Sequence, residues 1–300
     1  MSELERKVAV VIDSTSSLTQ AMGQEYGIHV LPIYVFFGTQ TYRDGVDLDA
    51  ESFYRLLRES KQLPTTSQPT VVDFVQAYSA LSEQAEAIVS IHLSQEMSAT
   101  LDSALGASRE LPDVPIHVID SRSTSMHLGL IAIAAARAAA AGQDAAEVVR
   151  LVEGLIPQAN IIFTVKTMEY LRKGGRIGGA TALLGSALSI KPVLYVRDGQ
   201  VEPLEKPRTR KRAVGRVLDL MAERVGSSQA VHAAVLHCDA PDEAQVLAEQ
   251  VTARFHCVEL LTTEAGPIIG THCGPGTLGV AFYAEGGVGR VESEAVLQGL

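Results

Sequence analysis

Hydroxyl side chains gather in three loops that each follow a predicted strand of the N-terminal half. The loops span residues 13–17, 94–100 and 120–125 and are rich in serine and threonine. The C-terminal ends of parallel strands meet at one edge of a sheet, so these loops are expected to ring a single crevice. Helix N-termini at the same edge add partial positive charge. The sequence therefore predicts a binding site for an anionic group at this edge.

A simpler explanation is that these side chains cap helices, which is common for serine, threonine and aspartate. A fourth hydroxyl-rich stretch, residues 64–69, precedes a predicted helix and is open to the same explanation. Hydrolysis is less well supported than binding, because a nucleophilic serine needs a positioned base and the GxSxG turn is absent from the sequence. We therefore interpret the crevice as a site that holds an anionic head group.

Short apolar runs alternate with helical patterns through the first half of the chain. Strands are predicted at residues 7–12, 29–36, 87–91 and 116–119, and helices at residues 18–26, 50–59, 71–84 and 99–110. Near-continuous apolar strands suit a parallel sheet that is covered on both faces. The N-terminal domain is therefore predicted to be α/β, with a doubly wound and mostly parallel sheet.

The pattern changes near Pro157, after two more predicted helices at residues 126–141 and 144–155. Further strands are predicted at residues 161–165, 193–196, 201–204, 230–236, 257–261 and 277–283. Two of them flank the Arg-Asp-Gly-Gln sequence of residues 197–200, which is typical of a β-hairpin. We predict a C-terminal α+β domain with a mixed sheet, and domains at residues 1–157 and 158–300.

Composition excludes several classes of function. The chain has 300 residues and a net charge of -10, which argues against a nucleic-acid surface. Its longest apolar stretch, residues 128–142, contains Arg137 and is shorter than the roughly 20 residues of a membrane span. Three cysteines without CxxC spacing suggest reduced thiols. No secretory signal is recognised, so a cytoplasmic protein without a membrane span is expected.

Two basic segments stand out against this acidic background. Residues 171–179 contain Arg172 and Arg176 among glycines, so the segment either cradles phosphate or ends a helix whose dipole the arginines stabilise. It matches neither the P-loop nor the dinucleotide-binding pattern. Residues 206–216 contain Arg208 and form either a solvated face or a docking site for an acidic partner.

Each of the three cysteines directly follows a histidine, which raises the question of a zinc site. Adjacent residues on a strand point to opposite faces, and the ligand spacing is irregular, so no metal is expected. His272 belongs to one of these pairs and lies in a glycine- and proline-rich stretch, residues 270–277. We interpret this stretch as a loop from which the imidazole can face an anion.

Five motifs in this order make the chain resemble the DegV family over essentially its whole length. They are VIDST at residues 11–15, YRDGVD at 42–47, TSQPT at 66–70, LRKGGRI at 171–177 and GTHCGPG at 270–276. The resemblance implies a two-domain fold with one long-chain fatty acid bound between the domains, and no other cofactor. It further implies that Thr66 and Ser98 hold the carboxylate, with His272 as a neighbour of the head group.

The match is incomplete around Ser98. Ala99 replaces the usual glycine of the family's serine motif, and Glu96 lies close enough in sequence to weaken carboxylate binding if it points inward. Some family members are carriers that present a fatty acid to a separate ATP-dependent kinase, which makes acyl phosphate for phospholipid synthesis. By that resemblance the chain itself is not an enzyme, and Arg172, Arg176 and Arg208 are candidates for contact with a kinase or its nucleotide phosphates.

Two other functions stay open on the sequence. An enzyme acting on a small anionic substrate at the same inter-domain crevice would need a small polar pocket and a base near Ser98. A regulator would bind the acyl ligand and change its interaction with another protein. The enzyme and the regulator would use the same crevice. The enzyme would convert its ligand, whereas the regulator would respond to it.

Overall fold

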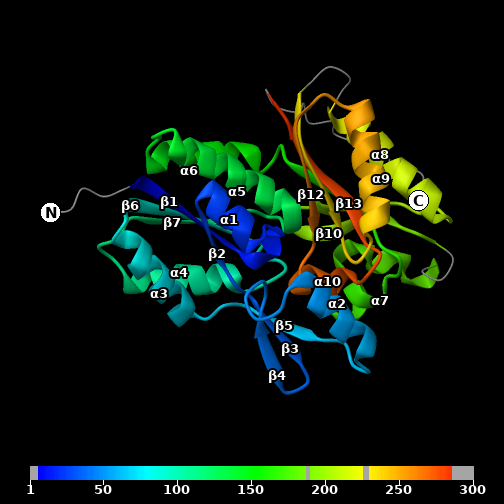
Figure 1. Ribbon diagram of the computed structural model, residues 1–300, viewed down its shortest axis with the longest axis horizontal. Coiled ribbons are helices and arrows are strands. Elements are labelled where there is room, and N and C mark those ends of the chain that lie inside the picture. The colour runs from blue at the N-terminus through cyan, green and yellow to red at the C-terminus, as the bar shows by residue number, and fades with distance from the viewer. Residues whose placement is uncertain (1–5, 187–189, 226–229, 286–300) are drawn as a thin grey trace.

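The computed structural model describes residues 6–186, 190–225 and 230–285 (Figure 1). Its N-terminal half contains a four-stranded sheet in the order β2-β1-β6-β7 in which every neighbouring pair is parallel. The strands are β1 (Arg6–Asp13), β2 (Ile28–Leu31), β6 (Ala85–His92) and β7 (Ile116–Asp120). The predicted parallel sheet is confirmed.

Helices cover both faces of this sheet, as its apolar strands require. On β1, Val8, Val10 and Ile12 pack with α5 and α6, whereas Ala9 and Val11 pack with α3 and α4. The helices around this sheet are α1 (Gln20–Tyr26), α3 (Val71–Ser82), α4 (Thr100–Glu110), α5 (Ser125–Ala140) and α6 (Ala145–Leu155). The period-2 alternation of β1 thus separates two apolar clusters.

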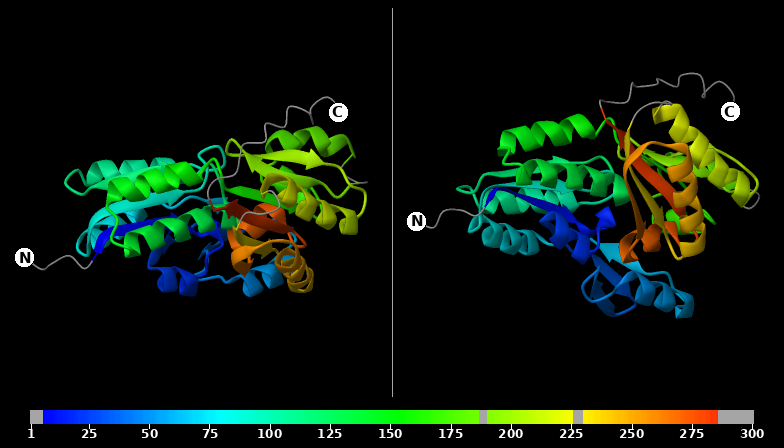
Figure 2. Two further views of the ribbon diagram at one scale, coloured as in Figure 1. Left: turned by 90° about the horizontal axis from the view of Figure 1, so that it is seen from above. Right: turned by 45° about the horizontal axis from the view of Figure 1, so that its top comes forward.

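The C-terminal half contains a six-stranded sheet in the order β10-β9-β8-β13-β11-β12. Only β11 and β12 pair in parallel; the other pairs are antiparallel, so the predicted mixed sheet is confirmed. The strands are β8 (Asn160–Thr164), β9 (Val193–Arg197), β10 (Gln200–Glu205), β11 (Val231–His237), β12 (Cys257–Glu264) and β13 (Leu278–Ala284). Helices α8 (Arg210–Val225) and α9 (Pro241–Arg254) cover one face, and α5 meets the sheet from the N-terminal half (Figure 2).

The predicted hairpin is confirmed as β9 and β10. Asp198 and Gly199 form its turn with φ values of 50° and 82°. A type I′ turn has positive φ at both central residues, and its twist matches that of the flanking strands. Asp-Gly is a preferred sequence for this turn because both residues tolerate positive φ.

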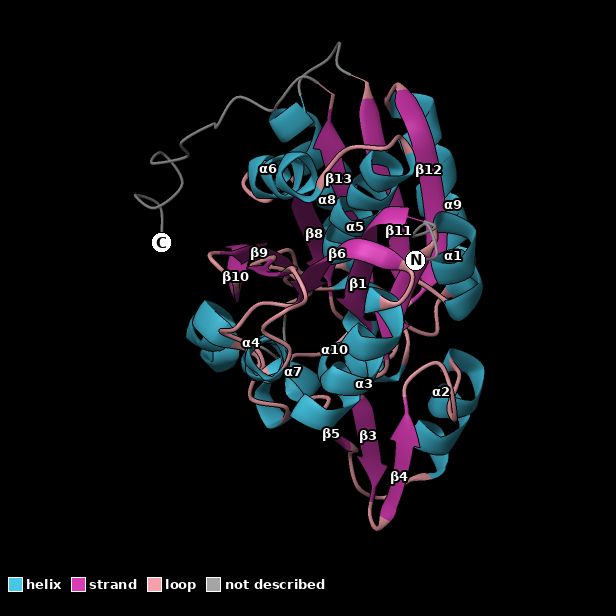
Figure 3. Ribbon diagram, turned by 90° about the vertical axis from the view of Figure 1, so that its left-hand side faces the viewer, coloured by secondary structure: helices cyan, strands magenta, loops and turns pink. Residues whose placement is uncertain are grey.

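A third, three-stranded sheet in the order β4-β3-β5 projects from the molecule beside α2 (Figure 3). Its elements are β3 (Tyr34–Phe37), β4 (Gln40–Arg43), β5 (Thr65–Ser67) and α2 (Ala50–Glu59). The prediction of one strand over residues 29–36 is therefore wrong. Pro32 has no N–H for a ladder hydrogen bond, and the chain leaves the parallel sheet there to enter the small one.

Short helices complete the chain around the junction of these sheets. They are the 3-10 helices η1 (Ser14–Ser16) and η2 (Gly178–Ser186) and the α-helices α7 (Glu169–Lys173) and α10 (Pro267–Cys273). Residues 270–277 were predicted to form a loop, but Pro267 begins a helix that runs to Cys273 and ends at Gly274. No helix in the described ranges is both long and apolar enough to cross a membrane.

Candidate functional site

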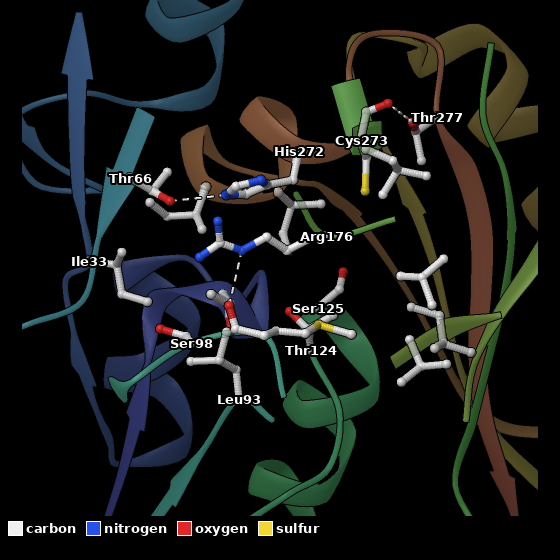
Figure 4. A pocket seen from close by; sticks show the side chains of 18 of the residues that line it. Ile33, Thr66, Leu93, Ser98, Thr124, Ser125, Arg176, His272, Cys273 and Thr277 are labelled. Carbon is white, nitrogen blue, oxygen red and sulfur yellow. Dashed lines mark hydrogen bonds between the residues drawn. The ribbon is translucent and has the colours of Figure 1, made fainter. Parts of the chain in front are cut away.

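A cavity lies where the three sheets meet, beyond the C-terminal ends of β1, β6 and β7 (Figure 4). Polar side chains line one part of it, and aliphatic and aromatic side chains line the rest. The polar part includes Thr15, Thr66, Ser67, Gln68, Ser98, Thr124, Ser125, Arg176, His272 and Thr277. The loops that the sequence predicted to ring one crevice therefore contribute to the same cavity.

Thr66 and His272 meet in the polar part although 206 positions separate them in the sequence. Thr66 lies on β5, and its Oγ1 is 3.0 Å from Nε2 of His272 on α10. The ring of His272 packs on Gly174, where a Cβ atom would overlap with Nδ1. The TSQPT and GTHCGPG motifs therefore supply this hydrogen-bonded pair, and Gly174 of the LRKGGRI motif leaves space for the imidazole ring.

Burial keeps the imidazole of His272 neutral near pH 7. Burial, assisted by the positive charge of Arg176, lowers its pKa to about 4. Its Nδ1 is buried and has no hydrogen-bond partner among the described residues. This nitrogen lies against Gly174, whereas Nε2 lies on the side of the ring that meets Thr66.

Ser98 lies two residues before Thr100, the first residue of the 11-residue helix α4. Its Oγ accepts a hydrogen bond from the backbone N–H of Thr100 at 3.3 Å and is 2.9 Å from Oγ1 of Thr100. The N-cap residue of α4 is Ala99 and no side chain caps this helix, so Ser98 forms a local turn before the helix and is not its cap. Its hydroxyl lines the cavity.

Arg176 brings a positive charge into the same corner. Its Nε donates to the carbonyl of Met97 at 3.0 Å, and its Nη1 donates to the carbonyl of Gly174 at 2.8 Å. Nη2 has no hydrogen-bond partner within the part of the chain that the structure describes. Figure 4 shows the guanidinium between His272 and Ser98. Four of the six predicted site residues therefore line this cavity: Thr66, Ser98, Arg176 and His272.

Arg172 and Arg208 lie elsewhere. Arg172 is exposed on the last turn of α7, and Arg208 is exposed just before α8. Residues 171–174 do form the basic helix end that the sequence allowed. The structure thus separates Arg176, which faces the cavity, from the two arginines on the surface.

Glu96, which would weaken carboxylate binding if it pointed inward, points away from the cavity. It is exposed, and its Oε2 accepts a hydrogen bond from Nε2 of Gln200 on the β9–β10 hairpin at 2.9 Å. The departure from the family serine motif therefore places an acid at the hairpin contact and not beside the hydroxyl of Ser98.

Apolar residues from both halves of the chain form the rest of the wall. They are Ile33, Leu93, Ile161, Phe163, Leu171, Val196, Val201, Leu236, Ile268 and Ile269. Those of β8 and the hairpin come from the C-terminal half, and the polar corner comes largely from the N-terminal half. A ligand with one anionic end and a long apolar part matches this division.

A buried network supports the hydroxyl loops from behind. Asp13 is fully buried, and one carboxylate oxygen accepts from the backbone and hydroxyl of Thr15 while the other accepts from the backbone of Leu93. The same carboxylate is 3.1 Å from Nδ1 of His92. Sequence reasoning treated residue 13 only as part of a loop; its role is to hold the ends of β1 and β6 together.

Metal binding finds no support in the described ranges, which contain no group of three histidine, cysteine, aspartate or glutamate residues placed to hold an ion. The three cysteines are free. Cys273 lines the cavity, and Cys238 is buried.

Comparison with known proteins places this cavity in context. A DegV domain-containing protein of Streptomyces coelicolor is 40% identical over 279 residues, covering 92% of this chain and 98% of that protein. A solved structure described as fatty acid binding of a DegV family protein from Thermus thermophilus has a TM-score of 0.88 at 33% identity, covering 93% of this chain and 99% of that one. DegV of Bacillus subtilis, described as a fatty acid binding protein, gives a TM-score of 0.87 at 33% identity, covering 93% and 100%. A family model described as an uncharacterised protein of the DegV family matches residues 7–285, so this chain belongs to the DegV family.

Proposed function

We propose that this protein binds one long-chain fatty acid in the cavity between its two halves. The observation that carries the proposal is the division of the cavity wall into a corner of hydrogen-bond donors and an apolar remainder. The solved relatives described as fatty acid binding proteins share the fold over more than nine-tenths of this chain, which supports the same ligand class.

The donors of the corner offset the cost of burying a carboxylate. An unpaired carboxylate is expensive to remove from water, whereas charge-assisted hydrogen bonds compensate that cost. The hydroxyls of Thr66 and Ser98 and the free Nη2 of Arg176 are suitable donors, with neutral His272 beside them. Burial of the acyl chain contributes about 0.8 kcal/mol per CH₂, roughly 10 kcal/mol for a long chain before association costs.

The finer proposal is that the protein is a carrier and not an enzyme. In this proposal residues 1–157 and 158–300 form the two domains, the fatty acid lies between them, and a separate ATP-dependent kinase phosphorylates it for phospholipid synthesis in the cytoplasm. Exposed Arg172 and Arg208 are the side chains available to such a partner, whereas Arg176 is committed to the cavity.

Mass spectrometry of an organic extract of the purified protein tests the ligand class. We expect one fatty acid per chain, in proportions that differ from those of the host lipid pool. An empty protein that also fails to bind added fatty acids would favour the small-substrate enzyme. Tight acyl binding that never stimulates a kinase would favour the regulator and overturn only the carrier role.

Substitution tests the head-group assignment. Thr66→Ala and Ser98→Ala should each lower fatty-acid affinity about tenfold, because each removes a hydrogen bond to a charged group. Thr65→Ala is the matched control, since Thr65 is exposed on the same strand and adjacent strand residues point to opposite faces. An unchanged affinity in the double variant Thr66→Ala, Ser98→Ala would refute the assignment.

A further inference from the structure

A second concave site lies on the C-terminal half, on the other side of the chain segment that follows α10. Three cationic side chains line it: Lys166 after β8, Lys191 before β9, and Arg210 at the start of α8. The start of α9 and residues 275–276 complete its wall. Cys273 lies two residues before this pair and Thr277 follows it directly, and both line the first cavity, which contains Thr66 and His272.

Arg210 enters this site with unused hydrogen-bonding capacity. Its Nε donates to Oε2 of Glu243 at 2.8 Å, and its Nη1 is 3.5 Å from the carbonyl of Thr164. Nη2 is buried and finds no partner in residues 6–186, 190–225 and 230–285. The side-chain hydroxyl of Thr164, a fully buried residue, is also unpaired in the same ranges. Unpaired buried donors are uncommon in folded proteins and indicate a missing partner.

The two lysines lie beside one another and keep their charges available. Nζ of Lys191 donates to the backbone carbonyl of Lys166 at 2.9 Å, which leaves two of its three protons free. The aliphatic stem of Lys166 packs against Gly276, where a Cβ would lie 3.1 Å from Cδ of the lysine. No ion pair joins either lysine to an acid within the described residues.

The acidic side chains of the site are largely engaged by other groups. Asp239 pairs with Arg58 of α2 at 2.6 Å, and Glu243 pairs with Arg210. Asp242 is exposed in the first turn of α9. The N-cap residue of α9, Ala240, makes no side-chain capping hydrogen bond, so the positive end of a 14-residue helix also faces this region.

We propose that the site lined by Lys166, Lys191 and Arg210 binds a phosphate group. A tetrahedral dianion has enough acceptor oxygens for the guanidinium of Arg210 and for both ammonium groups, and the first N–H groups of α9 add to that field. A carboxylate would satisfy the arginine but leave one lysine unused. The proposal does not depend on the acyl ligand, because the two sites share a wall segment but no cationic side chain.

Titration of the full-length protein with two probes, each followed by ³¹P NMR line broadening, tests the site. Inorganic phosphate tests recognition of the group alone, and glycerol 3-phosphate tests recognition of a phosphomonoester. We expect saturable binding of at least one probe, with a dissociation constant on the order of 1 mM. Equal affinities would assign the site to the phosphate group itself, and tighter binding of glycerol 3-phosphate would assign it to an organic phosphate.

Variants decide whether the observed binding belongs to this site. Lys191→Gln and Arg210→Gln should each weaken binding about tenfold, because each removes a charged donor. Lys211→Gln is the matched control, since Lys211 is exposed and adjacent to Arg210 on α8. Arg210 also supports Glu243, so Lys191→Gln is the decisive variant if Arg210→Gln alters the circular dichroism spectrum. No saturation up to about 20 mM of either probe, or an equal loss in Lys211→Gln, would overturn the proposal.

Discussion

The polar corner of the cavity combines hydroxyl, guanidinium and imidazole groups. The hydroxyls of Thr66 and Ser98 do not titrate in the physiological range. His272 is the member of this group whose ordinary pKa lies near neutrality, and burial moves it to about 4. The proton state of the corner is therefore constant over the range in which a fatty acid is ionised.

This constancy predicts that fatty-acid affinity is the same at pH 6.5 and pH 8. A neutral His272 gains no proton over that range, and a free carboxyl group of ordinary pKa is ionised throughout it. Fluorescence titration with a labelled long-chain fatty acid at both pH values is the measurement. A fall approaching tenfold per pH unit would mean instead that ligand binding takes up a proton at the imidazole.

Arg176 and Arg172 offer a matched pair for testing where the positive charge acts. Arg176→Gln should lower fatty-acid affinity about tenfold, because the guanidinium faces the cavity with Nη2 free. Arg172→Gln should leave affinity unchanged, since Arg172 is exposed on α7. Equal effects of the two substitutions would show that the arginines act through the overall field and not through contact.

At the scale of elements, the β9–β10 hairpin joins the C-terminal sheet to the hydroxyl loop of the N-terminal half. Gln200 bonds Glu96, and Gly199 contacts the side chain of Ser94, while Val196 and Val201 of the same hairpin line the cavity. The position of the hairpin tip therefore affects both the loop that carries Ser98 and the apolar wall.

Gly199→Ala should displace the hairpin tip and weaken fatty-acid binding. A Cβ there would overlap with Oγ of Ser94, and φ is 82°, a conformation that disfavours alanine by roughly 1 kcal/mol. Gly154→Ala is the control: Gly154 is exposed in α6, nothing lies within 4 Å of its added Cβ, and the change should stabilise the fold by about 0.5–1 kcal/mol. Urea unfolding and fatty-acid titration of both variants measure these effects. Unchanged affinity in Gly199→Ala would separate the hairpin tip from the cavity.

Local sequence patterns predicted the elements whose signals are local. The β9–β10 turn follows from Asp-Gly, and the parallel strands follow from their apolar runs. The break at Pro32 and the helix starting at Pro267 were missed, although proline marks both. Proline permits either a loop or a new element at these positions. Which one forms depends on the sheet or helix that the following residues join, and tertiary packing decides that.

The candidate site divides in the same way. Thr66, Ser98 and His272 were found through motifs that resemble a family, and the structure brings Thr66 and His272 into contact. The inward direction of Arg176 was not predicted, because it depends on how Met97 and Gly174 approach each other across the halves. The apolar lining has no local signature, since β8, the hairpin and α10 each contribute only a few residues.

At the scale of the molecule, buried and ionic contacts tie the halves together. Arg137 of α5 forms two 2.6 Å hydrogen bonds with Glu259 of β12, and the hydroxyl of Tyr54 donates to the carbonyl of Ala265. Asp44 lies at another such junction, where the turn after β4 meets the start of α10. It is 4% exposed, and burial raises the pKa of its carboxyl to about 7, opposed by hydrogen bonds from Ser14 and the backbone of Ile268.

Asp44 therefore gives the fold a predictable pH response. Its folded pKa lies above the unfolded value of 3.8, so stability from holding the proton is lost as pH rises through the window from 3.8 to about 7. Asp44→Asn removes this response, and its stability relative to the wild type should be roughly 1 kcal/mol more favourable at pH 8 than at pH 6. Urea unfolding at both pH values measures the difference, and pH 6 stays above the isoelectric point of about 5.3.

Asp47→Asn provides the control for this comparison, because Asp47 lies in the same turn but in a different environment. Hydrogen bonds from Arg43 lower the pKa of its carboxyl to about 2, so this group is ionised in the folded and unfolded states at pH 6 and at pH 8. The effect of Asp47→Asn on stability should therefore be the same at both pH values. Histidines that titrate in this window are common to the wild type and both variants and cancel in the differences. If Asp44→Asn also showed no pH dependence, the carboxylate at this junction would be ionised in the folded state, and the hydrogen bonds from Ser14 and Ile268 would outweigh the effect of burial.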